Sequence, residues 1–312
     1  MKSDISTVKN IKARSSIMSE KVKRNIIGWL LMLPGCICFI VFVIQPIIVG
    51  AYMSFFETQG FEAVKFVGLQ NYKDVITDSL FLKSILNSAK YCFWSVLIGG
   101  FTPLIIATML NEVVRGKTFF RFATYFPCII PGIVTSIMWK ILFQPDANGF
   151  LNMILGKFGI EPLQWLQNPS MTIPLIVFTM TWAAFGSTTL IYLASLQSID
   201  NSLYEAAEID GAGFFNKIRY VTFPHVSGML KMLLLLQIMG VFKVFQEPLA
   251  MTGGGPNNAS TSIMLTAYNY AFSYMQVGRS TALGMIIAVI LCGFSIVYFK
   301  GTSKNSCYVR VM

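Results

Sequence analysis

Charged residues are scarce in this sequence, and histidine is almost absent. Only 12% of the 312 residues are Asp, Glu, Lys or Arg, whereas soluble domains carry about 25%. The single histidine, His225, has no acidic partner within an apolar run, which argues against a histidine metal site or a proton relay. Because 54% of the residues are hydrophobic, the scarcity of charge predicts an integral membrane protein.

A nucleotide-binding motif is missing as well. Gly116-Lys117-Thr118 ends like a P-loop, but Asn111 stands where the first glycine is required, and no strand precedes it. The six cysteines lie mostly in apolar runs, and Cys36-x-Cys38 lacks the further ligands of a metal site. We therefore expect no catalytic residue, no metal site and no cofactor in this chain. If ATP drives the protein, ATP and Mg²⁺ bind to another subunit.

The apolar residues form six segments, each long enough to cross a bilayer, which takes about 20 residues. The first, 25–56, contains no charged residue at all. The expected organisation, in chain order, is a tail at 1–24, the first span at 25–56, a loop at 57–89, spans at 91–111, 122–139 and 173–196, a polar loop at 200–225, a span at 228–250, a loop at 251–279, a span at 280–299 and a tail at 301–312.

The net charge of +10 follows this organisation and does not indicate a nucleic-acid partner, because the bases gather at the ends of apolar segments. Most lysines and arginines lie in the two tails and in the loops 112–121 and 200–225. By the positive-inside rule, both termini and the 200–225 loop are cytoplasmic. The opposite, external loops carry six bases: Lys65, Lys73, Lys83, Lys140, Lys157 and Arg279.

The longest polar interval in the second half runs from Tyr204 to Pro224 and is predicted to form a helix, a turn and a second helix. Ser202 and Glu205 have the spacing of a capping box. Small alanines follow, and Gly211 is able to end the helix and admit another backbone. A short helix with a small-residue face, held between two spans, is typical of a docking element.

This interval resembles the EAA loop in the membrane subunits of binding-protein-dependent ABC importers. Further resemblance to the sugar-type permeases of that family runs through nearly the whole chain after residue 25. It includes Gly68-Leu69-x-Asn71-Tyr72 and, after the fifth span, Thr252-x-Gly254-Gly255-Pro256, a signature similar to that of maltose-type first permeases. The EAA-type residues are Glu205-Ala206-Ala207, Gly211 and Val221-x-Phe223-Pro224.

The resemblance implies an all-α, six-span fold of the ABC type-1 importer class, with the transport domain at 86–300. It implies a multi-pass subunit of the bacterial cytoplasmic membrane that moves a carbohydrate or related solute. The implied partners are a second, homologous permease, two ABC ATPase subunits and an extracytoplasmic solute-binding protein. Large external insertions of some maltose-type permeases are missing here, so the chain resembles the shorter six-span form.

The resemblance also implies roles for particular residues. The EAA-type loop is expected to couple the ATPase to the spans, and the external Gly254, Gly255 and Pro256 to face the binding protein. The expected coupling residues are Glu205, Ala206, Ala207, Asp210, Gly211 and Pro224.

The solute path is less clear from the sequence. Lys243 and Glu247 are four residues apart and are expected to form an ion pair on one helix face, which favours a structural role over solute contact. Trp182 is more readily explained as a residue that packs against neighbouring helices than as a ring that stacks on a sugar. The candidate path residues are Trp182, Ser187, Gln237, Gly240, Lys243 and Glu247.

Two alternatives remain open at this point. One is an ABC importer permease for a non-sugar solute. The other is an ATP-independent secondary transporter, for which only Lys243 and Glu247 offer ionisable groups inside a span.

Overall fold

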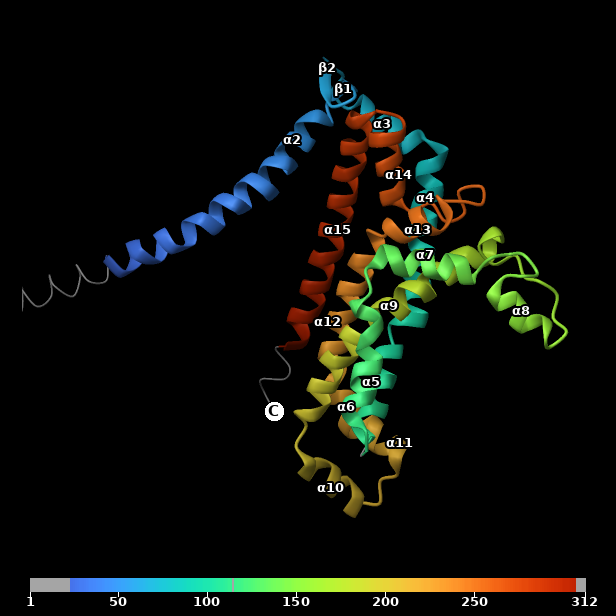
Figure 1. Cartoon of the computed structure of the whole chain (residues 1–312). Helices are drawn as coiled ribbons and strands as arrows, with labels where there is room; N and C mark the ends of the chain where they lie inside the picture. The colour runs from blue at the N-terminus through green and yellow to red at the C-terminus, as the bar shows by residue number, and fades with distance from the viewer. Residues whose placement is uncertain (1–22, 114, 307–312) are drawn as a thin grey trace, which may run out of the picture.

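The computed structural model describes residues 23–113 and 115–306, so most of the two expected tails, 1–22 and 307–312, lies outside the described residues. The described chain is mostly helical and forms an elongated bundle (Figure 1). Its helices are α2 (Gln45–Met53), α3 (Gln70–Thr77), α4 (Ser79–Trp94), α5 (Thr102–Glu112), α6 (Lys117–Tyr125), α7 (Gly132–Leu142), α8 (Phe150–Gly156), α9 (Pro169–Gln197), α10 (Asn201–Ile209), α11 (Phe214–Lys217), α12 (Phe223–Phe242), α13 (Gln246–Thr252), α14 (Ile263–Tyr268) and α15 (Val277–Ser306).

Five continuous helical stretches are long and apolar enough to cross a membrane. A bent pair of helices makes a sixth if it is taken as one span. The sequence-based expectation of six spans therefore depends on this bent pair. The five stretches are Lys23–Met53, Ser79–Glu112, Pro169–Gln197, Phe214–Phe242 and Val277–Tyr298.

The bent pair occupies the segment expected as a straight span at 122–139. Lys117–Ile129 and Gly132–Leu142 meet at 94°. Pro127 and Pro131 explain the bend, because each proline lacks an N–H donor and its ring clashes with the preceding helical turn. The second half, α7, turns away from the bundle and leads to α8 (Figure 1).

Helix α9 is the central element of the bundle, and it packs against α4, α5, α6, α7, α12 and α13. Its contact with α6 is unusually close at Gly186. A Cβ atom at this position would lie 2.2 Å from the Thr124 carbonyl oxygen and 2.9 Å from the Tyr125 Cα. Small residues at helix contacts are the usual means of close packing in membranes, where apolar burial gives little driving force.

The fourth of these five helical stretches begins earlier than its sequence suggests. The helix runs from Phe214 to Phe242 through a π-helical turn at Ile218–Thr222, and it ends at a break around Lys243. The span expected at 228–250 is therefore shifted toward the polar loop. Pro224 does not interrupt the helix because it follows the π-helical turn, whose widened backbone accommodates a residue without a free N–H.

A small β-hairpin, β1 (Phe56–Gln59) with β2 (Glu62–Phe66), departs from the all-α expectation for loop 57–89. The hairpin is fixed by α3, where Asn71 Nδ2 donates to the Ser54 and Phe56 carbonyl oxygens at 2.9 and 2.8 Å. The hydroxyls of Tyr72 and Ser54 are 2.8 Å apart. The Asn-Tyr pair of the sugar-permease signature thus anchors the hairpin to the first helix.

The glycine-rich turn after α13 is held by α4. Asn87 Nδ2 donates to the carbonyl oxygens of Asn258 and Thr261 at 2.8 and 3.1 Å. The Tyr91 hydroxyl donates to the Ser260 carbonyl oxygen at 2.9 Å. These buried groups fix the loop without regular secondary structure, as buried polar atoms require partners.

The first helical stretch, Lys23–Met53, projects away from the bundle in Figure 1. In its most apolar 18-residue window, no residue is buried by the rest of the described chain. It is joined to the rest at its C-terminal end, where α2 packs on α15. Its apolar side chains are therefore left for lipid or another subunit to cover.

We predict that Gly186→Ala destabilises the protein, because the added methyl group would overlap the α6 backbone. Overpacking of this kind costs about 1–3 kcal/mol. Gly284→Ala in α15 is the matched control, since nothing lies within 4 Å of its added Cβ. Thermal unfolding in detergent measures the difference, and equal midpoints for the two variants would contradict this packing account.

Candidate functional site

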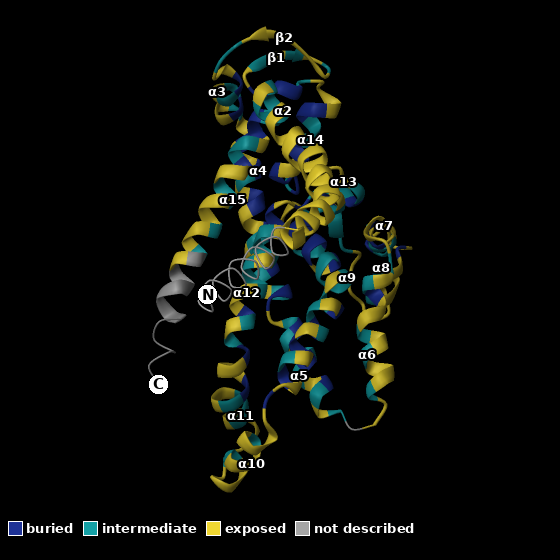
Figure 2. Cartoon of the chain, turned by 90° about the vertical axis from the view of Figure 1, so that its left-hand side faces the viewer, coloured by how far each residue is buried: buried dark blue, intermediate teal, exposed yellow. Residues whose placement is uncertain are grey.

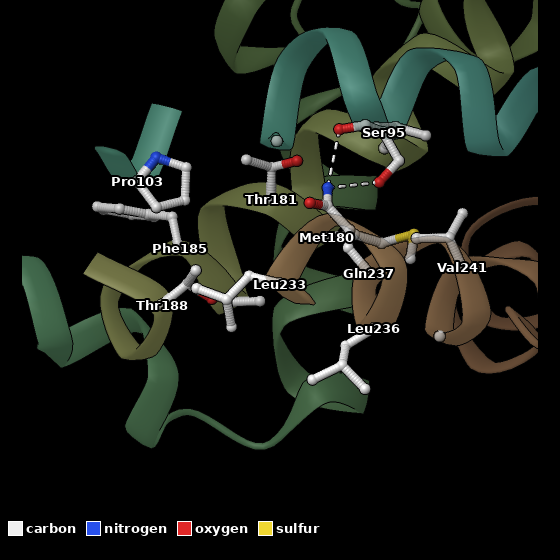
Figure 3. A pocket seen from close by; sticks show the side chains of 14 residues that line it. Ser95, Pro103, Met180, Thr181, Phe185, Thr188, Leu233, Leu236, Gln237 and Val241 are labelled. Atoms are coloured by element: carbon white, nitrogen blue, oxygen red, sulfur yellow. Dashed lines mark hydrogen bonds between the residues drawn. The ribbon is translucent and has the colours of Figure 1, made fainter. Parts of the chain in front are cut away.

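A cavity of about 330 Å³ lies between the π-helical turn Ser95–Gly99, the start of α5 and the helices α9 and α12 (Figure 3). Most of its wall is apolar, with side chains such as Met180, Phe185 and Leu233. Its polar groups are the hydroxyls of Thr181 and Thr188, the serine Ser95 and the amide of Gln237. A pocket of this type, mostly apolar with a few placed polar groups, is the usual form of a small-molecule site.

The side chain of Gln237 is held in place by Ser95, in the π-helical turn Ser95–Gly99 that follows α4. Its Nε2 donates to the Ser95 carbonyl oxygen at 2.8 Å and lies 2.7 Å from the Ser95 hydroxyl (Figure 3). Gly99 makes this approach possible, because a Cβ there would lie 2.7 Å from Gln237 Nε2 and 2.9 Å from Thr181 Oγ1. The amide oxygen of Gln237 has no hydrogen-bond partner among the described residues and is available to a ligand.

Of the path residues expected from the sequence, Gln237 and Gly240 line this cavity. Ser187 and Trp182 are not part of its lining. Ser187 is exposed and its hydroxyl returns to the Ala184 carbonyl oxygen at 2.9 Å, while Trp182 packs edge-on against Trp139. The packing interpretation of Trp182 agrees with this contact.

The expected Lys243–Glu247 ion pair is wrong. The ion pairs in the described part of the chain are Lys217–Glu208 and Arg279–Asp74. Helix α12 ends at Phe242, so Lys243 is its exposed C-cap while Glu247 belongs to the separate helix α13. The i, i+4 argument fails because no single helix contains both residues.

Thr181 and Thr188 were missed by the sequence reasoning. A signal for them exists, because cavity residues recur on α9 with helical spacing: Val177, Met180, Thr181, Ala184, Phe185 and Thr188. The two threonines are one heptad apart on that face. Without knowledge of which face is concave, this periodicity resembles ordinary packing.

The second candidate region is the helix-turn-helix of α10 and α11, at the end of the bundle remote from the β-hairpin (Figure 1). The α10 helix begins at Asp200, whose carboxylate accepts a hydrogen bond from the Ser202 backbone N–H at 3.0 Å. This bond lowers the pKa of Asp200. The expected capping box at Ser202 and Glu205 is therefore replaced by an aspartate cap two residues earlier.

The α10 helix ends in a Schellman motif. Gly211 has a φ of +76°, its N–H donates to the Glu208 carbonyl oxygen at 3.0 Å, and the Ala212 N–H donates to the Ala207 carbonyl oxygen at 2.8 Å. A left-handed residue at this place is strained for any side chain with a Cβ. Gly211 therefore sets the direction in which the chain returns to the bundle.

The tip of this region is apolar and open. Ile209 is 88% exposed and Phe215 is 82% exposed, while Glu205 and Ala206 lie on the exposed surface of α10. Exposed apolar residues gathered beside a charged group mark interaction sites more often than ordinary surface. Ala207 is half-buried, and Pro224 lies near the start of α12 behind the tip.

Behind the tip, a polar cavity of about 390 Å³ separates α10 from α5 and α11. Lys217 forms an ion pair with Glu208 across it, and the hydroxyls of Tyr204 and Thr222 are 3.0 Å apart. These contacts connect α10 directly to the root of α12. The helical stretch Phe214–Phe242, to which α10 is joined in this way, also carries Gln237.

The glycine-rich turn after α13 contains the other residues singled out by sequence. Gly254 is buried, and a Cβ there would lie 2.5 Å from Thr261 Oγ1. The Ser260 hydroxyl donates to the Gly255 carbonyl oxygen at 2.7 Å. Gly254 and Gly255 of the Gly-Gly-Pro signature therefore stabilise the turn. Asn257 and Asn258 form its exposed surface.

Comparison with solved structures gives close agreement in fold. A bacterial ABC transporter involved in the import of the acidic polysaccharide alginate has a chain that matches with a TM-score of 0.82 and 22% identity, covering 92% of this chain and 98% of that one. A structure of the alginate transporter in complex with an alginate pentasaccharide-bound periplasmic protein matches with a TM-score of 0.80 and 23% identity, covering 89% and 94%.

Curated relatives align over nearly their whole length. The trehalose/maltose transport system permease protein MalF of Thermococcus litoralis is 33% identical over 281 residues, 90% of this chain and 95% of the relative. The multiple sugar-binding transport system permease protein MsmF of Streptococcus mutans is 31% identical over 289 residues, 91% and 98%. The probable ABC transporter permease protein YurN of Bacillus subtilis is 30% identical over 283 residues, 89% and 96%.

The family model described as "binding-protein-dependent transport system inner membrane component" matches residues 99–301, which include all residues lining the central cavity except Ser95, the α10–α11 tip and the glycine-rich turn after α13. These relatives are membrane permeases rather than enzymes. The chain therefore belongs to the family of inner membrane components of binding-protein-dependent transport systems.

Proposed function

We propose that this chain is one of two membrane subunits of an ATP-driven ABC importer and forms half of the path for a carbohydrate or a related solute. The observation that carries the proposal is the exposed tip of α10 and α11, which presents Ile209 and Phe215 beside Glu205. The chain contains no nucleotide-binding motif, and we place ATP and Mg²⁺ on two ATPase subunits, one of which docks on this tip.

The structure of the α10–α11 tip suits it to couple the ATPase to the membrane spans. Glu205 meets a basic group of the ATPase, and Ala206 and Ala207 allow its surface to approach closely. Asp210 and Gly211 set the turn, and the ion pair of Lys217 with Glu208 ties the two short helices together. Closure of the ATPase dimer moves the tip, and the continuous helix from Phe214 to Phe242 carries the movement to the cavity.

The proposed topology has both termini and the α10–α11 tip in the cytoplasm of a bacterium, in agreement with the distribution of lysine and arginine. The opposite end, with the β-hairpin and the Gly254–Pro256 turn, then faces the binding protein. The alginate transporter, whose fold this chain shares, has been solved in complex with a periplasmic protein, which supports this assignment.

A second permease completes the path. The cavity opens at the surface of this chain, where Ala184 and Leu236 are exposed. An open apolar half-cavity of this kind is closed when a homologous subunit packs against the same face. The projecting helix Lys23–Met53 offers additional apolar surface for such a partner.

The chemistry of the cavity agrees with a hydroxyl-rich solute. Thr181 and Thr188 each supply a hydroxyl group that donates and accepts, and Gln237 supplies a free amide oxygen. None of the residues lining the cavity is ionised, which does not favour a charged solute. Relatives named for maltose, trehalose and arabinooligosaccharide transport support a sugar, and a non-sugar solute is the alternative.

We predict that Glu205→Arg with Gly211→Trp abolishes ATPase binding but leaves the second permease bound. The substitutions reverse the charge of the docking surface and place a bulky side chain at a left-handed residue. The matched control is Glu161→Arg with Gly159→Trp, because Glu161 is also exposed and Gly159 also has a positive φ of +74° with open space around it. Copurification from mild detergent measures the outcome.

Loss of the ATPase from the control as well would contradict the assignment of α10 as the docking element. Recovery of the wild-type chain without any P-loop ATPase, together with ATP-independent uptake, would refute the importer proposal itself.

We predict that Ala184→Trp blocks solute uptake while ATPase binding is kept, because the indole fills the cavity. Ile191→Trp is the control, since Ile191 lies on the same helix and is exposed outside the cavity. Uptake of a radiolabelled oligosaccharide mixture into cells separates the two. Undiminished uptake by Ala184→Trp would place the solute path elsewhere.

A further inference from the structure

Helix α7 lies across the direction of α6. The two halves of the bent pair, Lys117–Ile129 and Gly132–Leu142, meet at 94°. Figure 2 shows α6 running along the bundle, with α7 and α8 beyond its upper end. The first half is only about 20 Å long, whereas the hydrocarbon core of a bilayer is about 30 Å thick. Measured from the charged residue Lys117, the bend therefore falls short of the opposite membrane surface.

The exposed face of α7 is an unbroken row of isoleucines. Three of them, spaced four residues apart on one side of the helix, are 45%, 48% and 55% exposed: Ile133, Ile137 and Ile141. The polar residues Thr135 and Ser136 are buried on the other side. Lys140 borders the row, and its Nζ donates to the Ala250 carbonyl oxygen at 3.2 Å. The polar groups of α7 thus face the protein, and its apolar groups face outward.

The loop from residue 143 to residue 165, which contains α8, is a compact unit closed around one asparagine. Asn152 is 2% exposed. Its Nδ2 lies 3.1–3.3 Å from the carbonyl oxygens of residues 144–146 and of Leu163. Its Oδ1 accepts from the Leu163 N–H at 3.1 Å and from Trp165 Nε1 at 2.8 Å. Because both ends of the loop are bound to one buried side chain, the position of α8 is fixed.

Helix α8 also presents apolar side chains outward. Leu151 and Asn152 lie on its inner side. The outward residues, followed by two more after the helix, are 40–77% exposed: Phe150, Met153, Ile154, Phe158 and Ile160. Neither α7 nor α8 contains an acidic residue. Lys157, at the end of α8, has a long apolar stem that lets its ammonium group reach headgroups or water.

The loop lies at the height of the first turns of α9. An apolar cluster joins side chains of the loop to the beginning of that helix: Phe143, Leu151 and Trp165 with Ile173, Ile176 and Val177. Helix α9 has 29 residues, which gives it a length of about 43 Å, more than the roughly 30 Å of a hydrocarbon core. Its first turns therefore lie at the membrane surface, and the loop that packs on them lies there too.

We propose that residues 132–165 form an in-plane unit, whose isoleucine and phenylalanine face is covered by lipid acyl chains. The leaflet concerned is the one remote from the α10–α11 tip. Lipid is the occupant because this face continues the outward apolar surface of a chain with several spanning helices. Short helices with one apolar face and few charges are suited to the membrane interface. The sequence alone placed Lys140 and Lys157 of this unit in an external loop.

Spin labels in lipid vesicles test the placement. The full chain carries serine at its six cysteine positions, and single nitroxides are attached at Ile137→Cys, Ile154→Cys or Phe158→Cys. The lipid reference is Val289→Cys, 71% exposed in α15, and the water reference is Lys65→Cys in the β-hairpin. At the three test positions, we expect a ratio of oxygen to nickel-chelate collision rates several-fold above that of the water reference.

Asn152→Ala tests whether the loop is held in the membrane by its own structure. Removal of the amide frees both ends of the loop, so the collision ratio at Ile154 and Phe158 should fall toward that of water. The ratio at Ile137 should stay high, because α7 keeps its own contacts with α9 and α13. Asn148→Ala is the matched control, since Asn148 is an exposed residue of the same loop, and it should change none of the three values.

Nickel-chelate collisions at Ile154 and Phe158 as frequent as those at Lys65 would overturn the proposal. Low access to both oxygen and nickel chelate, appearing only after the second permease or a binding protein is added, would assign the face to that protein and also overturn it. None of these measurements requires an ATPase, so the in-plane unit and the importer assignment can fail independently.

Discussion

The close packing of α9 against its neighbours is the constraint on which the rest of the structure depends. This helix lines the cavity and packs against both halves of the bent α6–α7 pair. Near its end, Leu196 belongs to an apolar cluster that includes Tyr204 of α10. Gly186 lets α6 approach to backbone contact, and Gly99 leaves room for the side chains of Gln237 and Thr181 next to the π-helical turn Ser95–Gly99. Larger residues at either glycine would separate the helices and open the cavity.

The packing of α9 supports a proposed division of the molecule into a fixed end and a movable end. One end is a rigid unit, in which Asn71, Asn87 and Tyr91 bind backbone carbonyl groups of neighbouring loops. The other end is the α10–α11 tip, which is joined to the bundle by the Lys217–Glu208 ion pair and the Tyr204–Thr222 contact. A structure that is firmly fixed at one end and lightly connected at the other is suited to rocking between two states.

Much of this arrangement was predictable from the sequence, for physical reasons. The absence of charge over residues 25–56 and 91–111 predicts spanning helices, because ionised groups are costly in lipid. The family likeness rested on Glu205-Ala206-Ala207 and Gly211, and the family match agrees with it.

Other features depend on contacts that no single segment determines. The break at Lys243 leaves no local signal such as a proline at that position, so the expected pair with Glu247 failed. The 94° bend lies at Pro127 and Pro131. From the sequence alone, the two prolines were expected only to be tolerated within a straight span. The roles of Thr181 and Thr188 follow from the concave face of α9, which appears only once α4, α5 and α12 are in place.

The central claim is that the α10–α11 tip docks an ATPase, and photocrosslinking from this tip tests it most directly. A photoreactive phenylalanine at Ile209, incorporated in intact cells, should capture a P-loop ATPase, because this side chain is almost fully exposed at the tip of α10. The same probe at Phe158, exposed in the loop between α8 and α9, should not capture an ATPase. Capture of an ATPase from Phe158 and not from Ile209 would contradict the account.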